Sequence, residues 1–255
     1  MLVSVQASRG SVPREAGTWM AVFATGFVGT IGGGHLEFQA IAHARHTLNG
    51  GPCISPVRYA LGPSLGQCCG GEVHLQFERV NAADLGALKA RLQPVRAPVA
   101  LFGGGHVGHA LIDVLGNLPL RITWVDSRDE IFPNSLPEHV VCEHSDPVQA
   151  AVRALDPGSR VLTMSFSHAE DLEVVASCLM RQRLQADLPF IGLIGSRTKW
   201  ATFRHRLEAR GFTPRELAHV TCPIGIPGIR GKAPEVIAVA VAAQILQSLS
   251  ADTQG

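Results

Sequence analysis

Charged side chains, aromatic side chains and long hydrophobic runs are all scarce in this chain of 255 residues. Charged residues make up 17% of the sequence and the net charge at pH 7 is +1, so no overall field attracts nucleic acid or an anionic membrane. The longest apolar run, 236–246, is interrupted by Gln244 and is too short to cross a bilayer. We therefore expect neither a nucleic-acid partner nor a membrane span. The 46% apolar composition is instead typical of a globular protein with a sizeable core.

A disulfide framework is also missing, although the chain has six cysteines. They lack the dense and even spacing of small secreted proteins, and the N-terminus has no basic stretch followed by an apolar signal segment. We therefore expect a cytoplasmic protein in a reducing compartment. The cysteines are Cys53, Cys68, Cys69, Cys142, Cys178 and Cys222.

Two regions with different hydrophobic periodicity divide the chain. Residues 1–92 combine short strands, punctuated by glycines, with a helix at about 35–48, which predicts a small α+β domain. The segment 93–98 carries two prolines and suits an extended linker. From 98 to 250, short apolar strands alternate with Gly-rich turns and helices, which predicts a Rossmann-like parallel sheet. The expected fold class is therefore α/β, with a smaller α+β domain at the amino terminus.

The apolar pattern also places the individual elements. The last helix begins with Pro234 in its first turn and is apolar nearly all round, so we expect it in the core or in an oligomer interface. The expected strands lie at 2–7, 18–24 and 27–31, near Val57 and Val73, and at 99–102, 121–126, 140–143, 161–164 and 190–194.

The most informative short motif is Gln67–Gly71, where two adjacent thiols stand before two glycines. Glycines let the backbone approach whatever the sulfur touches. Adjacent cysteines point in different directions and form a poor disulfide pair, so we expect one of Cys68 and Cys69 to face a ligand. The alternative is that both are small buried hydrophobic residues, as free cysteines often are.

A second motif, Gly103–Gly108, matches G-x-G-x-x-G between an expected strand and an expected helix. Such a turn offers backbone N–H groups and the positive end of a helix to a phosphate. Asp126, 23 residues after Gly103, is placed to accept a hydrogen bond from a ribose hydroxyl. The motif predicts a nucleotide-binding geometry, with NAD(P), another phosphate-bearing ligand or no ligand as open alternatives.

Residues 195–199 follow an apolar strand and open a helix with cations in its first turn. Arg197 and Lys199 oppose the helix dipole there unless an anion lies between them and the N–H groups. We therefore expect a bound phosphate near Ser196, Arg197 and Lys199, at the carboxyl edge of the sheet where α/β proteins bind ligands. The alternative is that both cations extend into water.

Two further loops of small residues lie in the amino-terminal region, at 10–14 and 29–37. Arg14 is a candidate clamp for a phosphate or a pterin carbonyl, and Gly33 and Gly34 belong to a second backbone cradle. Glu37 either accepts hydrogen bonds from an amino-pyrimidine edge or, as we favour, sits in the first turn of a helix where its charge is stabilised.

Isolated histidines are weaker candidates. His168 and Asp171 lie three residues apart at the start of a predicted helix and so share a face, but one His and one Asp fall short of a metal site. His106 stands inside the Gly-rich turn, where it either contacts a ligand or faces solvent.

Taken in order, these segments resemble the xanthine dehydrogenase accessory protein family of the XdhC/CoxI type over nearly the whole chain. The motifs that carry the resemblance are Arg9–Arg14, Gly29–Glu37, Gly66–Gly71, Phe102–Gly108, Val125–Arg128, Gly192–Lys199 and Cys222–Gly225.

The resemblance implies a chaperone rather than an enzyme. Such a protein binds molybdenum cofactor (Mo-molybdopterin), holds it while a cysteine desulfurase replaces an oxo ligand with sulfur, and delivers it to apo xanthine dehydrogenase or a related molybdenum hydroxylase. It also implies a homodimer and a role for Cys69 as the thiol nearest molybdenum, with Cys68 second. The predicted cofactor-binding positions are Arg14, Gly33, Gly34, Glu37, Cys68, Cys69, Gly70, Gly71, Gly103, Gly104, Gly105, His106, Gly108, Asp126, Arg128, Ser196, Arg197 and Lys199.

Two departures from the family pattern and two rival functions complete the interpretation. Phe166 stands where the family usually has a histidine, and the sequence begins inside the first expected strand, where relatives usually carry a preceding helix. The first rival is an NAD(P)-dependent oxidoreductase that uses the Gly103–Gly108 turn. The second is a sulfur carrier that holds a persulfide on Cys68 or Cys69.

Overall fold

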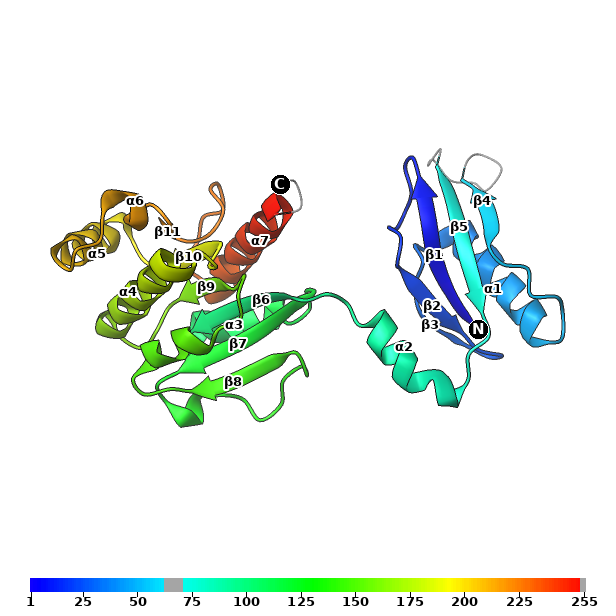
Figure 1. Cartoon of the computed structure of the whole chain (residues 1–255), viewed down its shortest axis with the longest axis horizontal. Coiled ribbons are helices and arrows are strands. Elements are labelled where there is room, and N and C mark those ends of the chain that lie inside the picture. Colours follow the sequence, from blue (N-terminus) through cyan, green and yellow to red (C-terminus); the bar gives the residue numbers. More distant parts are fainter. Residues whose placement is uncertain (62–70, 253–255) are drawn as a thin grey trace. The chain divides into compact units, whose positions relative to one another are not determined.

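The computed structural model describes residues 1–61 and 71–252, and the chain divides into two compact units, Met1–Gln93 and Pro94–Gly255 (Figure 1). The expected α/β class is confirmed, with an antiparallel sheet in the first unit and a parallel sheet in the second. Each unit has its own hydrophobic core, so the features of each follow separately.

The amino-terminal unit contains a five-stranded antiparallel sheet in the order β3-β2-β1-β5-β4. In β5, buried positions alternate with half-buried ones, as expected for a sheet with one covered face. The strands are β1 (Leu2–Arg9), β2 (Trp19–Val22), β3 (Phe27–Gly29), β4 (Val57–Ala60) and β5 (Glu72–Glu78).

Helix α1 (Gly34–Leu48) covers this sheet (Figure 1). Its buried residues Leu36, Ala40, Ala44 and Thr47 recur at helical spacing and form one stripe toward the core. A 3₁₀ turn η2 (Ala82–Asp84) and a short helix α2 (Leu85–Leu92), with no buried residue, follow β5.

The carboxy-terminal unit contains a six-stranded parallel sheet in the order β11-β10-β9-β6-β7-β8. The chain starts in the middle, at β6, moves outward through β7 and β8, and then returns to the other side of β6 as β9. The strands are β6 (Ala97–Phe102), β7 (Leu120–Asp126), β8 (Val140–His144), β9 (Arg160–Thr163), β10 (Phe190–Leu193) and β11 (Val220–Thr221).

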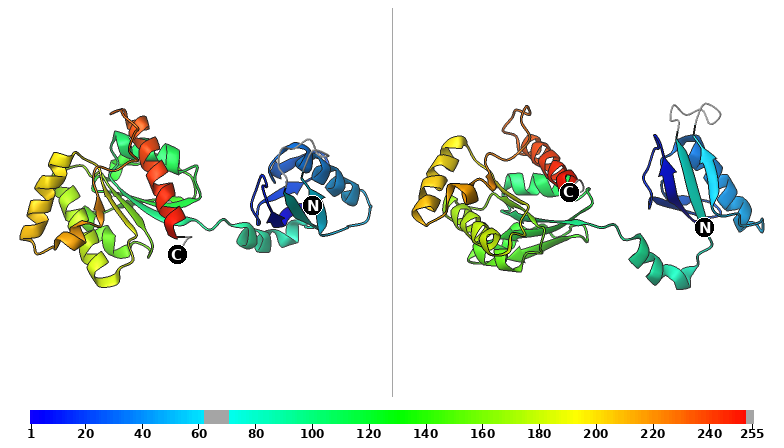
Figure 2. Two further views of the ribbon diagram at one scale, coloured as in Figure 1. Left: turned by 90° about the horizontal axis from the view of Figure 1, so that it is seen from above. Right: turned by 45° about the horizontal axis from the view of Figure 1, so that its top comes forward.

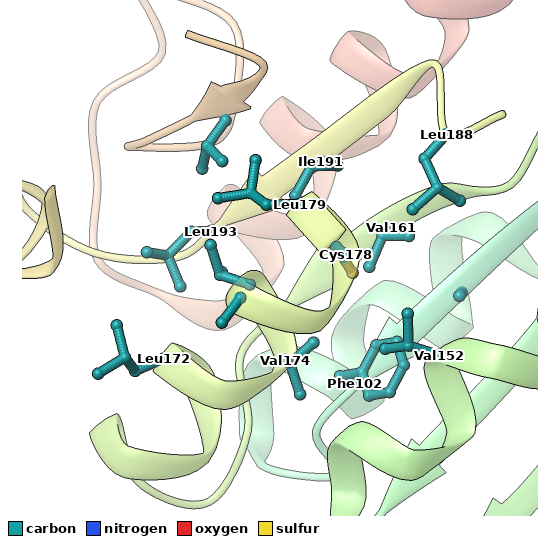
Figure 3. Close-up of a cluster of buried hydrophobic side chains, with 14 of the residues drawn as sticks. Phe102, Val152, Val161, Leu172, Val174, Cys178, Leu179, Leu188, Ile191 and Leu193 are labelled. Atoms are coloured by element: carbon teal, nitrogen blue, oxygen red, sulfur yellow. The ribbon is translucent and has the colours of Figure 1, made fainter. Parts of the chain in front are cut away.

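Helices cover both faces of the parallel sheet (Figure 2). On one face, α3 (His106–Leu115) and α7 (Pro234–Asp252) pack together. On the other, α4 (His168–Gln185), α5 (Arg197–Ala209) and α6 (Pro214–Leu217) close a second core, part of which is drawn in Figure 3. Two 3₁₀ segments, η3 (Asp129–Ile131) and η4 (Val148–Ala154), complete the connections.

The expected helix at about 35–48 and the expected strands are present, with ends shifted by one to a few residues. The short edge strand β11 was not expected from the sequence. The last helix is less buried than its composition predicts. Ala238, Val241 and Ile245 of α7 are buried, whereas Val239 and Leu246 are exposed, so the helix has one outward face. Within 1–61 and 71–252, none of the helices combines the length and hydropathy that a membrane span requires.

Candidate functional site

The Gly-rich turn after β6 is tightly packed against neighbouring backbone. A Cβ atom at Gly103, where φ is 123°, would lie 2.0 Å from the carbonyl oxygen of Met164. The buried indole Nε1–H of Trp124 donates to the Gly103 carbonyl at 3.0 Å. Only glycine fits at this position, because both its φ and the close carbonyl exclude a side chain.

Asp126, the last residue of β7, does not have the free carboxylate that ribose binding requires. It is 1% exposed, and its Oδ2 accepts from the Gly104 N–H at 2.6 Å and from Arg128 Nη2 at 3.0 Å. Its Oδ1 accepts from the Arg128 backbone N–H at 2.9 Å and from Arg128 Nε at 2.8 Å. Four donors occupy the roughly four acceptor positions of a carboxylate. In this geometry Asp126 holds the turn itself, and a ribose hydroxyl could bind it only by displacing one of these donors.

The ionisation of Asp126 follows from the same contacts. Burial raises the pKa of this carboxyl, but the hydrogen bonds from Arg128 and from the Gly104 N–H outweigh it, so the net pKa lies below the ordinary value. The hydrogen bond to Asp126 in turn raises the pKa of the Arg128 guanidinium. Asp126 is thus a fixed negative charge at neutral pH that is already neutralised by a neighbouring cation.

The cation expected to hold a phosphate at the start of α5 is also paired within the protein. Lys199 Nζ donates to Asp171 Oδ2 at 2.6 Å and to the Ile194 carbonyl at 2.9 Å, and both side chains of the pair are largely buried. The anion that resolves the conflict with the helix dipole is therefore a carboxylate from the first turn of α4, and a bound phosphate at Lys199 is not needed. Ser196 caps α5 by accepting from the Lys199 N–H, and Arg197 is exposed.

A bridge joins the segments that follow β7 and β9, the two neighbours of β6. The Arg128 guanidinium carbon lies 4.6 Å from the centre of the Phe166 ring, and Phe166 as a residue is 67% exposed. Beside it, the Ser127 hydroxyl donates to Glu170 Oε1 at 2.8 Å, and Glu170 Oε2 accepts from the Phe166 N–H at 3.1 Å. The carboxyl ends of both strands are thus tied together.

The remaining candidates of this unit do not form a metal or acid–base cluster. His106 is exposed at the start of α3, and His168 contacts the ring of Phe203 rather than Asp171. Burial raises the pKa of the Cys222 thiol, whose sulfur lies 4.0 Å from the Ser196 carbonyl oxygen. Across 1–61 and 71–252, no three His, Cys, Asp or Glu side chains are placed to hold a metal ion.

In the amino-terminal unit, Glu37 of α1 organises the loop that precedes its own helix. Its Oε2 accepts from the Thr30 hydroxyl at 2.5 Å, from the Ile31 N–H at 3.1 Å and from the Gly33 N–H at 3.2 Å. The favoured interpretation of Glu37 as a residue of the first helical turn therefore agrees with the structure, and this oxygen is not free for a ligand. Gly32, Gly33 and Gly34 all have positive φ.

Three of the motifs meet at one end of this sheet. A Cβ at Gly71 would lie 2.4 Å from the Ser11 carbonyl oxygen, and a Cβ at Gly32 would lie 2.6 Å from Cβ of Pro13. The loop at 10–14 therefore packs against both the Gly-rich loop and the residue before β5. Arg14 is exposed, and nothing lies within 4 Å of a Cβ built at Gly33, so this edge is open to solvent.

The predicted ligand thiols belong to the connection between β4 and β5. Cys68, Cys69 and Gly70 lie outside the described residues. At the ends of that connection, the Leu61 N–H donates to the Gly71 carbonyl at 2.7 Å. Its carboxyl-terminal end thus lies at Gly71, beside the Ser11 carbonyl described above.

Several contacts that define these sites have no local signal in the sequence. Asp171 is 28 residues from Lys199, and Trp124 is 21 residues from the Gly103 carbonyl that it binds. The bridge between Arg128 and Phe166 likewise depends on the strand order. Knowledge of the strand order β9-β6-β7 would have placed the segments that follow β7 and β9 next to one another.

Comparisons with known proteins agree with this arrangement. Residues 99–245 match the XdhC Rossmann domain, and residues 1–59 match the XdhC and CoxI family. The chain is 28% identical over 244 residues to the uncharacterized protein YqeB of Escherichia coli K12, covering 94% of this chain and 42% of that protein. It therefore spans about two fifths of the length of this curated relative.

A solved structure shares the fold. The crystal structure of a protein described as a xanthine dehydrogenase from Bacillus halodurans matches with a TM-score of 0.78 at 18% identity, over 98% of this chain and 91% of that one. The family matches cover the Gly-rich turn, the bridge above it and the loops around Glu37. On these grounds, the chain belongs to the XdhC and CoxI family.

Proposed function

We propose that this protein is an accessory protein that binds molybdenum cofactor and delivers it to xanthine dehydrogenase or a related molybdenum hydroxylase. The cargo would be Mo-molybdopterin, which a cysteine desulfurase supplies with sulfur before delivery. Family membership supports the accessory role.

The observation that carries the proposal is the meeting of three motifs at one end of the amino-terminal sheet. Gly71 packs against the 10–14 loop, which packs in turn against Gly32. In the sequence, Cys68 and Cys69 come directly before Gly70 and Gly71, and Gly71 is the first described residue after them.

The residue types of these motifs suit such a cargo chemically. A cysteine thiolate is a soft ligand, which fits molybdenum with sulfur ligands, and Cys69 is the leading candidate. Arg14, which is exposed, offers a guanidinium that can pair with a phosphate. Glu37 would act indirectly, by fixing the shape of the Gly-rich loop through its bonds to Ile31 and Gly33.

The experiment is retention of Mo-molybdopterin after gel filtration, with molybdenum and pterin measured in each protein. We expect near-stoichiometric retention by the wild type and loss of retention by Cys69→Ala. Cys53→Ala is the matched control, because Cys53 is an exposed free thiol of the same unit. It should retain the cargo like the wild type.

Two results would contradict the proposal. One is retention by Cys69→Ala that equals that of the wild type, and the other is a wild type that retains no cargo at all. Circular dichroism of each variant separates loss of the site from loss of the fold.

A further inference from the structure

Phe166 is exposed, yet its backbone and one face of its ring are held by contacts within the protein. It is 67% exposed, and its backbone N–H is held by Glu170, which also binds the Ser127 hydroxyl. Large apolar side chains gain free energy by burial, so an exposed phenylalanine whose backbone is fixed by a hydrogen bond calls for an explanation.

A cation supports one face of this ring. The Arg128 guanidinium lies 4.6 Å from the ring centre, and Asp126 fixes its orientation through bonds to Nε and Nη2. Since one face of Phe166 is covered by Arg128 and the ring is still two-thirds exposed, the opposite face is open to solvent. The open face therefore presents an aromatic surface of fixed orientation on which a planar ring can stack.

The location supports a ligand at this ring. Phe166 follows β9 and Arg128 follows β7, on either side of the carboxyl end of β6. This is where the strand order reverses, which is where open α/β sheets bind ligands. We propose that Phe166, backed by Arg128, is a stacking platform for a planar nitrogen heterocycle, namely a nucleobase or a pterin ring.

The same geometry predicts how the platform selects its ligand. Asp126 has no remaining acceptor position for a ribose hydroxyl, since Gly104 and Arg128 occupy its oxygens. Recognition therefore depends on the ring rather than on the sugar. We expect AMP and 2′-deoxy-AMP to bind with similar affinities.

The test is isothermal titration calorimetry of the full chain with AMP, 2′-deoxy-AMP, a soluble pterin and ribose 5-phosphate. We expect saturable binding of at least one of the ring-bearing probes at or below about 1 mM. Phe166→Ala should weaken that binding by about 5- to 100-fold, whereas Phe166→Tyr should retain it. Binding of ribose 5-phosphate, which has no planar aromatic ring to stack, should be insensitive to the substitution.

The probes also identify the source of the ring. Weakening of AMP binding alone assigns a nucleobase, weakening of pterin binding alone assigns a pterin, and weakening of both assigns any planar heterocycle. Phe38→Ala is the matched control, because Phe38 is 69% exposed in the other unit, and it should bind like the wild type.

The proposal would be overturned if neither AMP nor the pterin bound to the wild type, or if Phe166→Ala bound them unchanged. It would also fail if AMP bound much more tightly than 2′-deoxy-AMP. These outcomes are independent of molybdenum retention at Cys69, since they concern the carboxy-terminal unit and metal-free probes.

Discussion

In both units, a carboxylate of the protein accepts hydrogen bonds from a Gly-rich loop, but the two carboxylates come from different parts of the fold. Each unit has a strand, a Gly-rich loop and then a helix, and in each the loop N–H groups bind a carboxylate of the protein itself. In the amino-terminal unit the carboxylate is Glu37, four residues after Gly33 on the helix that follows the loop. In the carboxy-terminal unit it is Asp126, 22 residues from Gly104 on the neighbouring strand.

The two carboxylates differ in which segments they connect. Glu37 is half-buried and binds only its own loop, so it acts as a local brace. Asp126 is buried and joins the Gly-rich turn to Arg128, whose guanidinium covers Phe166 beyond β9. A Gly-rich loop before a helix is thus not by itself a ligand cradle, because the protein can fill the anion position with its own side chain.

The largest effect is expected for Asp126→Ala. The substitution leaves the N–H groups of Gly104 and Arg128 without their acceptor in a buried place, while Arg128 can still turn toward water. We expect the free energy of unfolding of the carboxy-terminal unit to fall by about 2–4 kcal/mol. Urea denaturation followed by tryptophan fluorescence measures it, and a loss below about 1 kcal/mol would contradict the proposed tie.

Asp126→Asn at several pH values is the control for the charge. Because the folded-state pKa of Asp126 is lowered, the carboxylate stabilises the fold above its unfolded-state pKa, and this contribution is lost as the pH falls through the folded-state pKa. The stability difference between wild type and Asp126→Asn should therefore shrink as the pH is lowered below about 4. A constant difference would show that charge is not its origin.

A smaller effect is expected for Glu37→Ala in the amino-terminal unit. The carboxylate accepts three hydrogen bonds, but the loop that donates them borders solvent, so water can replace the lost acceptor. We expect a loss of about 1–2 kcal/mol, confined to that unit. Hydrogen exchange measured by mass spectrometry should show faster exchange in residues 30–37 and unchanged exchange around the Gly103 turn.

Comparable effects of Glu37→Ala and Asp126→Ala would remove the distinction between a local brace and a tie across strands. So would faster exchange around the Gly103 turn in the Glu37 variant. Thr30→Val is a partial control, because it removes one of the three donors to Glu37 together with the acceptor of the Gly32 N–H. It should have a weaker effect in the same direction as Glu37→Ala.

The smallest effects come from two glycines with open surroundings. Nothing lies within 4 Å of a Cβ at Gly33 or at Gly105, but Gly33 has a φ of 74° and Gly105 a φ of −76°. Gly33→Ala should therefore destabilise its unit by about 1 kcal/mol, whereas Gly105→Ala should change stability by less than about 0.5 kcal/mol. Thermal denaturation of the two variants checks the pair, and equal losses would mean that backbone conformation is not what distinguishes them.

The sequence was sufficient for the features that depend on local pattern. Apolar strands separated by helices gave the parallel sheet, and the helix after the first Gly-rich loop begins within a residue of its predicted position. The partners of charged residues were not predictable in this way. Lys199 was assigned to a bound anion because Asp171 lies 28 residues away, and only the pairing of β9 with β10 brings the segments that follow these strands together.

The same limit applies to the ring of Phe166. In the sequence it is a substitution in a polar segment that offers no clue to its surroundings. That Arg128 lies beside Phe166 can be inferred only once β9 and β7 are known to flank β6. Residues that follow parallel strands meet at one edge whatever their separation along the chain, so strand order is the information that a single sequence supplies least directly.

Trp124 makes the Gly-rich turn observable by NMR without an attached probe group. Its indole N–H binds the Gly103 carbonyl and its ring is fully buried, so a shift of the turn would change the chemical shift of that proton. The chain contains three tryptophans, which limits the indole N–H region of a proton–nitrogen spectrum to three signals. Replacing Trp124 with Phe would assign its signal, after which each addition of a compound reports directly on this edge of the sheet.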